Sequence, residues 1–160
     1  MIGGYRKPRI ANDLQNRYLD QPTVTSWDFG IGASGPTIFV RLRTVDDVKA
    51  LNEIFLGLAE RPGARIDLSA QPGIQLHRIS RCELVSIERS LSKRLRRVND
   101  GPAFEWSCTA DEWATAAALL DPFLAGSRGH QYLTQEGLDD AIVEVSYGEE
   151  DSTIERDKPR

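Results

Sequence analysis

The chain has 160 residues, of which 40% are hydrophobic and 28% charged, and its net charge is −4. This length and composition are typical of one soluble globular domain that buries a core without disulfides or metals. No apolar run approaches the ~20 residues of a membrane-spanning helix, and Met1–Asp20 lacks the apolar stretch of a secretory signal, so we predict a cytoplasmic protein. The mild negative charge argues against nonspecific binding to nucleic acid.

The N-terminal part of the chain predicts a leader followed by a β-hairpin. Residues 1–22 are polar and contain two prolines, which indicates a partly ordered leader. Residues 23–29 and 37–43 alternate between apolar and other side chains, as half-buried strands do. The glycine-rich residues 30–36 break this alternation, so we predict a flexible loop between the two strands of the hairpin.

Within that loop, residues 30–35 (Gly-Ile-Gly-Ala-Ser-Gly) match the GxGxxG fingerprint of dinucleotide-binding proteins. The fingerprint holds a pyrophosphate only where its glycines lead from a strand into the N-terminus of a helix. Here Pro36 and a second strand follow instead. We therefore predict no cofactor, and we interpret the glycines as a hairpin loop, with contact to a partner as the alternative.

A strand, a helix cap, an amphipathic helix, a glycine and another strand occur twice, in residues 37–68 and 103–134. Thr44 and Thr109 each precede an acidic residue by three positions, which is the capping-box pattern of a helix start. Apolar residues then recur at helical spacing, and a proline is expected to end each helix, in the second case Pro122. The apolar faces of the two leading strands differ by one register, so we infer similar architecture and no duplication.

Alternation predicts further short strands at residues 66–68, 74–79, 82–88, 131–133 and 141–147. The basic segment 90–98 fits both a short helix and a solvated loop. Residues 149–160 are charged and poor in apolar side chains, so we expect a disordered acidic tail. Together these elements predict a single α+β domain over residues 23–148, with a mixed or mainly antiparallel sheet and two amphipathic helices packed on one face.

Metal-binding and nucleophilic signatures are weak in this chain. It has two cysteines and two histidines, whereas a structural zinc site usually takes four such ligands in closely spaced pairs. We therefore predict no metal site, and reduced thiols for Cys82 and Cys108. His77 and Cys82 resemble a base and a nucleophile, but no third group orients them. No catalytic residue is predicted.

Adjacent carboxylates occur in three places. Asp46–Asp47 and Asp111–Glu112 lie in the first turns of the predicted helices, where the helix dipole favours negative charge. Asp139–Asp140 precedes the last strand, and we interpret this pair as a turn or a cation site.

A basic stretch is the strongest electrostatic feature, and basic side chains of this kind bind phosphates or an acidic partner. Aromatic residues are absent from the stretch, which disfavours base stacking. The tryptophans are expected in or near the core, and Trp27 is taken as a candidate surface anchor because aromatic residues are enriched at interface hot spots. The predicted partner-binding residues are Arg89, Lys93, Arg94, Arg96, Arg97 and Trp27.

The leading hypothesis for function is a small protein-binding module, because charge is segregated along the chain while no site chemistry stands out. This profile is similar in outline to bacterial immunity-type or antitoxin-type inhibitors, which implies a protein partner. One alternative is an enzyme with a site near His130, Asp139 and Asp140. Another is phosphate or nucleic-acid binding through Arg89–Arg97.

Overall fold

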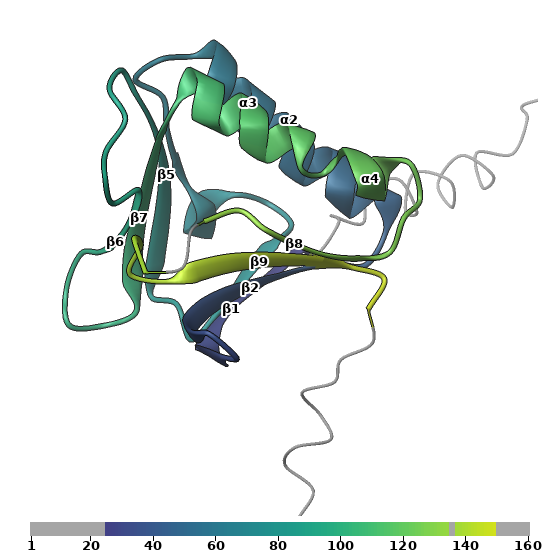
Figure 1. The fold of residues 1–160 in the computed structure, drawn as a ribbon, viewed down its shortest axis with the longest axis horizontal. Coiled ribbons are helices and arrows are strands. Elements are labelled where there is room, and N and C mark those ends of the chain that lie inside the picture. Colours follow the sequence, from purple (N-terminus) through teal and green to yellow (C-terminus); the bar gives the residue numbers. More distant parts are fainter. Residues whose placement is uncertain (1–24, 135–136, 150–160) are drawn as a thin grey trace, which may run out of the picture.

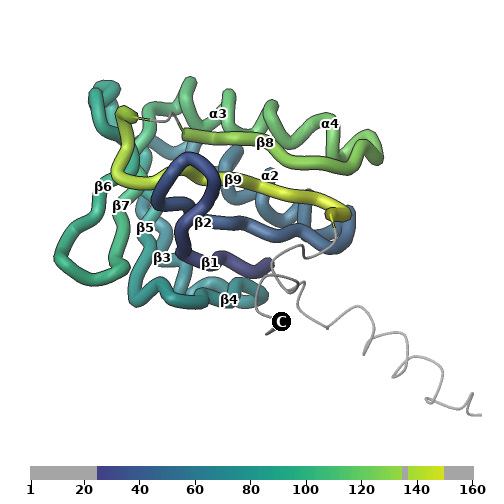
Figure 2. The backbone as a smooth tube through the Cα atoms, turned by 60° about the horizontal axis from the view of Figure 1, so that its bottom comes forward, coloured from purple at the N-terminus to yellow at the C-terminus, as the bar shows by residue number. Residues whose placement is uncertain are grey.

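The computed structural model describes residues 25–134 and 137–149, and its strands form two mixed sheets. The five-stranded sheet contains, in spatial order, β4 (Ile74–His77), β1 (Thr25–Gly32), β2 (Gly35–Leu42), β9 (Ile142–Tyr147) and β8 (Gly129–Tyr132). The four-stranded sheet contains, in spatial order, β3 (Arg65–Asp67), β5 (Arg81–Ile87), β7 (Ala103–Thr109) and β6 (Leu95–Arg97). Figure 2 shows the strands of the five-stranded sheet lying in this order.

Two helices, α2 (Val45–Glu60) and α3 (Ala110–Ala118), pack side by side across the two sheets (Figure 1), and the short α4 (Asp121–Leu124) follows α3. The predicted α+β class is confirmed, but the strands lie in two sheets instead of one. The connections explain the difference. Helix α2 leads from β2 in one sheet to β3 in the other, and α3 and α4 lead back from β7 to β8. Each predicted strand–helix–strand unit therefore crosses between sheets.

A single apolar cluster fills the space between the helices and both sheets. At its centre Trp106 of β7 lies 4.9 Å, ring centroid to centroid, from Trp113 of α3, and Phe55 of α2 lies 5.5 Å from Trp113. The indole Nε1 of Trp113 donates to the carbonyl of Val85, 3.0 Å away on β5. Aromatic packing and this bond hold the helices against the four-stranded sheet.

Both predicted capping boxes are confirmed. The Thr44 hydroxyl accepts from the amide of Asp47 at 3.2 Å, and the Asp47 carboxylate accepts from the amide of Thr44 at 2.9 Å. Thr109 and Glu112 exchange the same two bonds at 3.3 and 3.0 Å. The β7 strand runs directly into its cap, whereas Arg43 separates β2 from Thr44, which accounts for the one-residue difference in register between the two strands.

The predicted glycine loop is wrong, because β1 and β2 continue through most of it. Gly32 pairs with Gly35, and the turn consists of Ala33 and Ser34 alone. Gly35 adopts a φ of +113°, which L side chains rarely adopt. A Cβ on Gly32 would lie 2.7 Å from the Thr37 hydroxyl. These glycines therefore serve a tight hairpin.

Two further predictions need correction. Segment 90–98 is neither a helix nor only a loop, because Leu95–Arg97 forms the edge strand β6, where Leu95 pairs with Trp106 and is buried. Helix α3 ends at Ala118, before the predicted position, and Pro122 lies in the first turn of α4. A proline is tolerated there because the first-turn amides have no partner within the helix.

Within the described residues, no helix has both the length and the apolar composition needed to cross a lipid bilayer. The predicted leader, residues 1–22, and all of the predicted acidic tail except Glu149 lie outside the described residues.

Candidate functional site

The basic stretch is largely paired with carboxylates from other elements. The ion pairs are Lys93 with Asp140 (2.7 Å), Arg94 with Glu112 (2.5 Å) and Arg96 with Glu105 (2.6 Å). Arg97 lies over the ring of Phe29, 5.3 Å from its centroid, while Arg89 is exposed. These contacts therefore hold the basic stretch in a defined conformation on the protein surface.

Asp139 and Asp140 form the scaffold for β6. The Asp139 carboxylate accepts from the backbone amides of Arg94 (2.7 Å) and Leu95 (2.9 Å). The Asp140 carboxylate accepts from the amide of Arg97 at 2.9 Å. The Lys93 ammonium and this amide hold the pKa of Asp140 below its usual range. Of the two predicted readings, the structure favours the turn: the carboxylates satisfy amides at a sheet edge.

A network of arginines and glutamates, here called the arginine face, continues this surface across the outer side of the four-stranded sheet. Its members are Arg65 on β3, Arg81 and Glu83 on β5, Glu105 on β7 and Arg96 on β6. The Glu83 carboxylate contacts Arg65 at 2.5 Å and Arg81 at 2.7 Å, and Arg65 also lies 3.9 Å from Glu105. The hydrogen bond from Arg65 lowers the pKa of Glu83 below its usual range, with a further contribution from Arg81. Every strand of the sheet contributes to the network.

Trp27 is not a surface anchor, which corrects the prediction. Its side chain is 0% exposed, because β1 directs it into the core between Val40 of β2 and Leu76 of β4. Its indole Nε1 has no hydrogen-bond partner among the described residues. A residue buried in this way contributes to stability and does not contact a partner.

The cysteines are free, as predicted, and both are buried. Burial raises the pKa of the Cys82 thiol to about 12 and that of Cys108 to about 12. Because only the thiolate is an effective nucleophile, neither thiol is activated. The structure therefore gives no support to His77 and Cys82 as a catalytic base and nucleophile.

The structure separates the residues of the suggested enzyme site. His130 of β8 pairs with Ser146 of β9, whereas Asp139 and Asp140 precede the start of β9 at Ile142. The strand between Ile142 and Ser146 alone spans ~13 Å at roughly 3.3 Å per residue. Proton transfer requires hydrogen-bond contact or one bridging water. His130 and the two aspartates therefore form no common site.

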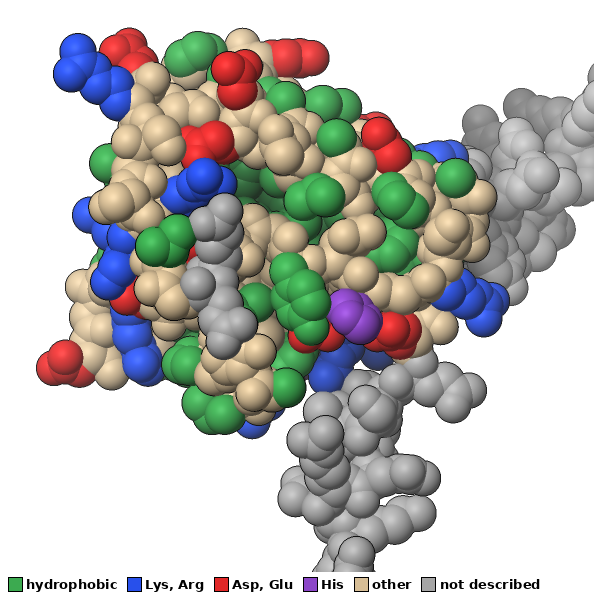
Figure 3. Space-filling view, in the orientation of Figure 1, with side chains coloured by type: hydrophobic (Ala, Val, Ile, Leu, Met, Phe, Trp, Pro, Cys, Tyr) green, Lys and Arg blue, Asp and Glu red, His purple; other side chains and the backbone are tan. Residues whose placement is uncertain are grey.

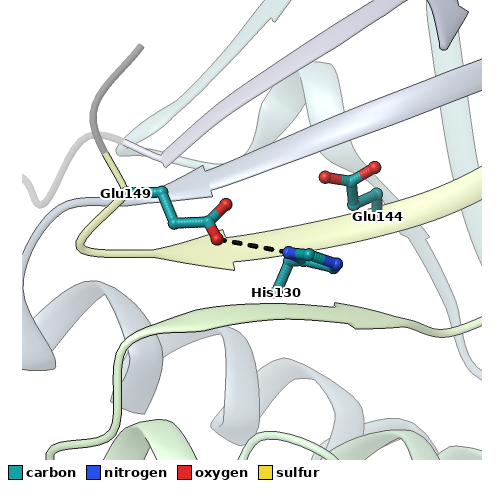
Figure 4. Close-up of side chains that lie close together, drawn as sticks. All are labelled: His130, Glu144 and Glu149. Atoms are coloured by element: carbon teal, nitrogen blue, oxygen red, sulfur yellow. Dashed lines mark hydrogen bonds and ion pairs between the residues drawn. The ribbon is translucent and has the colours of Figure 1, made fainter. Parts of the chain in front are cut away.

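His130 instead belongs to a cluster that the sequence prediction missed. Its Nδ1 lies 3.2 Å from the Glu149 carboxylate, and Glu144 points toward the same place (Figure 4). Ligand atoms of all three side chains lie within 4.8 Å of one another. The prediction of no metal site relied on closely spaced ligands along the chain, whereas here the β8–β9 pairing brings the ligands together. Strands were predicted in both places, so an antiparallel pairing between them was the available signal.

Comparison of the sequence with known protein families and with curated proteins gave no match.

Proposed function

We propose that the protein is a protein-binding module whose arginine face contacts acidic side chains of a partner. One observation carries the proposal: the cations of this face point outward while their carboxylates lie beneath. The side chains of Arg65, Arg81 and Arg96 are 59%, 61% and 47% exposed, but those of Glu83 and Glu105 only 11% and 22%. A partner approaching this sheet therefore meets guanidinium groups first.

The underlying carboxylates also restrict the motion of these arginines. An interface loses free energy for each long side chain that it immobilises, about 0.5–1.5 kcal/mol. Arginines already held by Glu83 and Glu105 lose less side-chain conformational freedom on binding. Arginine is enriched at interface hot spots, and exposed Leu91 and Val98 flank β6 with apolar surface. The basic side chains gathered along this side of the molecule are visible in Figure 3.

The same features favour a protein over a nucleic acid. Three arginines of the face lie against two glutamates, so the face has too few unpaired cations for a run of phosphates, whereas a few carboxylates of a protein can pair with the outward guanidinium groups. Nucleic-acid binding depends on neutralising many phosphates at once. An immunity-type or antitoxin-type inhibitor is the finer form of the proposal, because such a protein needs only a rigid surface that occupies its partner.

The test is purification from the native cell at physiological salt, with tagged wild type and two charge-reversed variants. We expect a stoichiometric protein partner for the wild type and its loss in Arg81→Glu/Arg96→Glu. The control, Arg43→Glu/Arg61→Glu, changes the net charge equally at exposed positions near the two ends of α2 and should retain the partner. Recovery of the bare protein, or equal loss in both variants, would contradict the proposal. Recovery with nucleic acid would favour phosphate binding instead.

A further inference from the structure

The cluster of His130, Glu144 and Glu149 lies on the five-stranded sheet, separate from the arginine face on the four-stranded sheet. Two of its members are set by backbone pairing. Tyr132 pairs with Glu144 and His130 with Ser146, so His130 and Glu144 are diagonal neighbours on one face of two antiparallel strands. Glu149 follows Gly148, whose φ of +66° turns the chain after β9.

The donor atoms of the cluster are nearly as close to one another as the ligands of a bound metal ion. Two ligands on a tetrahedral zinc ion lie ~3.3 Å apart, because Zn–N and Zn–O bonds are about 2.0–2.2 Å long. The donor atoms of the cluster lie within 4.8 Å of one another before any ion draws them together. The side chains of His130 and Glu149 are 44% and 42% exposed, so each can rotate to bring its donor atom to the ion. Solvent also has access to the site.

The donor set selects the class of ion. Imidazole nitrogen suits zinc and neighbouring transition metals, whereas magnesium and calcium prefer a shell of oxygen ligands. Two carboxylates offset the charge of a divalent cation. Three protein ligands leave a coordination position for water.

We propose that His130, Glu144 and Glu149 bind one divalent transition-metal ion, with Zn²⁺ as the expected occupant and water completing its coordination. The ion joins the edge strand β8, the central part of β9 and the chain after β9. It therefore stabilises this edge of the five-stranded sheet. The proposal is independent of the arginine face, and neither stands or falls with the other.

The test is calorimetric titration of the full chain with Zn²⁺ after removal of metals by a chelator, together with Co²⁺ absorption spectra. We expect one equivalent to bind, a visible Co²⁺ spectrum, and a rise in the melting temperature with Zn²⁺. His130→Ala and Glu144→Gln should each weaken Zn²⁺ binding at least ~10-fold, since even outer-shell changes at metal sites cost about 10–100-fold. Glu144→Gln retains the size of the side chain, so it reports on binding even where His130→Ala impairs folding.

The matched control is His77→Ala, which removes the other histidine of the chain, exposed on β4 at the opposite edge of the same sheet. It should bind Zn²⁺ like the wild type. A second control, Glu150→Gln/Asp151→Asn, removes the acidic residues that follow the cluster in sequence and should also leave binding unchanged. The proposal is wrong if saturable Zn²⁺ binding is absent, if His130→Ala binds as tightly as the wild type, or if Mg²⁺ competes at equal concentration.

Discussion

At the scale of single residues, the three tryptophans show how differently one residue type is used. All three are buried, and the indole nitrogen of Trp113 donates to the carbonyl of Val85. Within residues 25–134 and 137–149 the indole nitrogen of Trp27 has no hydrogen-bond partner, whereas the side chain of Trp106 interacts with the Cys108 thiol. A buried polar group without a partner costs free energy. Trp27 therefore contributes to stability through the size of its ring and not through its polar atom.

Replacing tryptophan by phenylalanine tests this difference. Trp113→Phe should destabilise the protein by about 1 kcal/mol more than Trp27→Phe, because it also removes the buried hydrogen bond to the Val85 carbonyl. Both changes remove the same atoms from a fully buried tryptophan, so Trp27→Phe is the matched control. Urea unfolding monitored by circular dichroism gives both free energies. Equal losses of stability would mean that the bond to Val85 contributes nothing.

The two thiols should be unreactive in the folded protein. Burial raises the pKa of Cys82 and of Cys108 to about 12 in each case, so thiolate is scarce at pH 8 and reagents have no access. We expect a disulfide reagent such as dithionitrobenzoate to react with both thiols in guanidinium chloride and only at the rate of unfolding in buffer. Rapid reaction of one thiol in the native protein would show that its site is open.

At the scale of secondary-structure elements, the helix starts depend on local chemistry and the edge strand β6 on distant residues. Thr44 and Thr109 form capping boxes with partners three residues away, which is why the sequence pattern alone located both helices. In contrast, β6 is a three-residue strand in which the Leu95 and Arg97 amides bond to Asp139 and Asp140, more than 40 residues later. No local pattern distinguishes such a strand from a loop.

The two capping boxes contribute measurably to the free energy of unfolding. Thr44→Ala and Thr109→Ala should each lower the free energy of unfolding by about 1 kcal/mol, since each leaves a first-turn amide without its acceptor. The serine variants should recover most of the loss. Thr115→Ala, at an exposed interior position of α3, is the control: it removes only a hydroxyl bond to the Asp111 carbonyl of the same helix and should not lower stability by more than ~0.5 kcal/mol. Caps that contributed nothing would leave all the variants equally stable in urea.

At the scale of the whole molecule, ion pairs link strands that are distant in sequence, and this makes the fold sensitive to acid. Glu83 joins β5 to β3, and Asp140 joins the chain before β9 to the other sheet at β6. Both carboxyl groups have a pKa below the usual range, because each accepts hydrogen bonds from basic side chains or amides while ionised. Each therefore binds a proton more readily in the unfolded chain.

It follows that stability contributed by these groups is complete above the ordinary carboxyl pKa values, about 3.9 for Asp and 4.3 for Glu. It is lost as the pH falls through those values to the lowered folded ones. We expect the free energy of unfolding to decrease as the pH falls below about 5, with a shallower decrease in Asp140→Asn. Asp100→Asn, in the exposed turn after β6, should follow the wild type. Urea unfolding at several pH values measures this, and parallel curves for wild type and Asp140→Asn would contradict it.

The sequence alone determined the α+β class, both helix starts and the presence of most strands, because caps and apolar alternation act between residues a few positions apart. Only the tertiary structure decided which strands share a sheet, since the two strand–helix–strand units look alike whether they stay in one sheet or cross to a second. It also decided which side chains face solvent and which of them lie together. Strand pairing decides three features: the outward arginines over Glu83 and Glu105, the burial of Trp27, and the cluster of His130 with Glu144 and Glu149. Pairing is a contact between distant segments, and free energies spread over the whole core select its register.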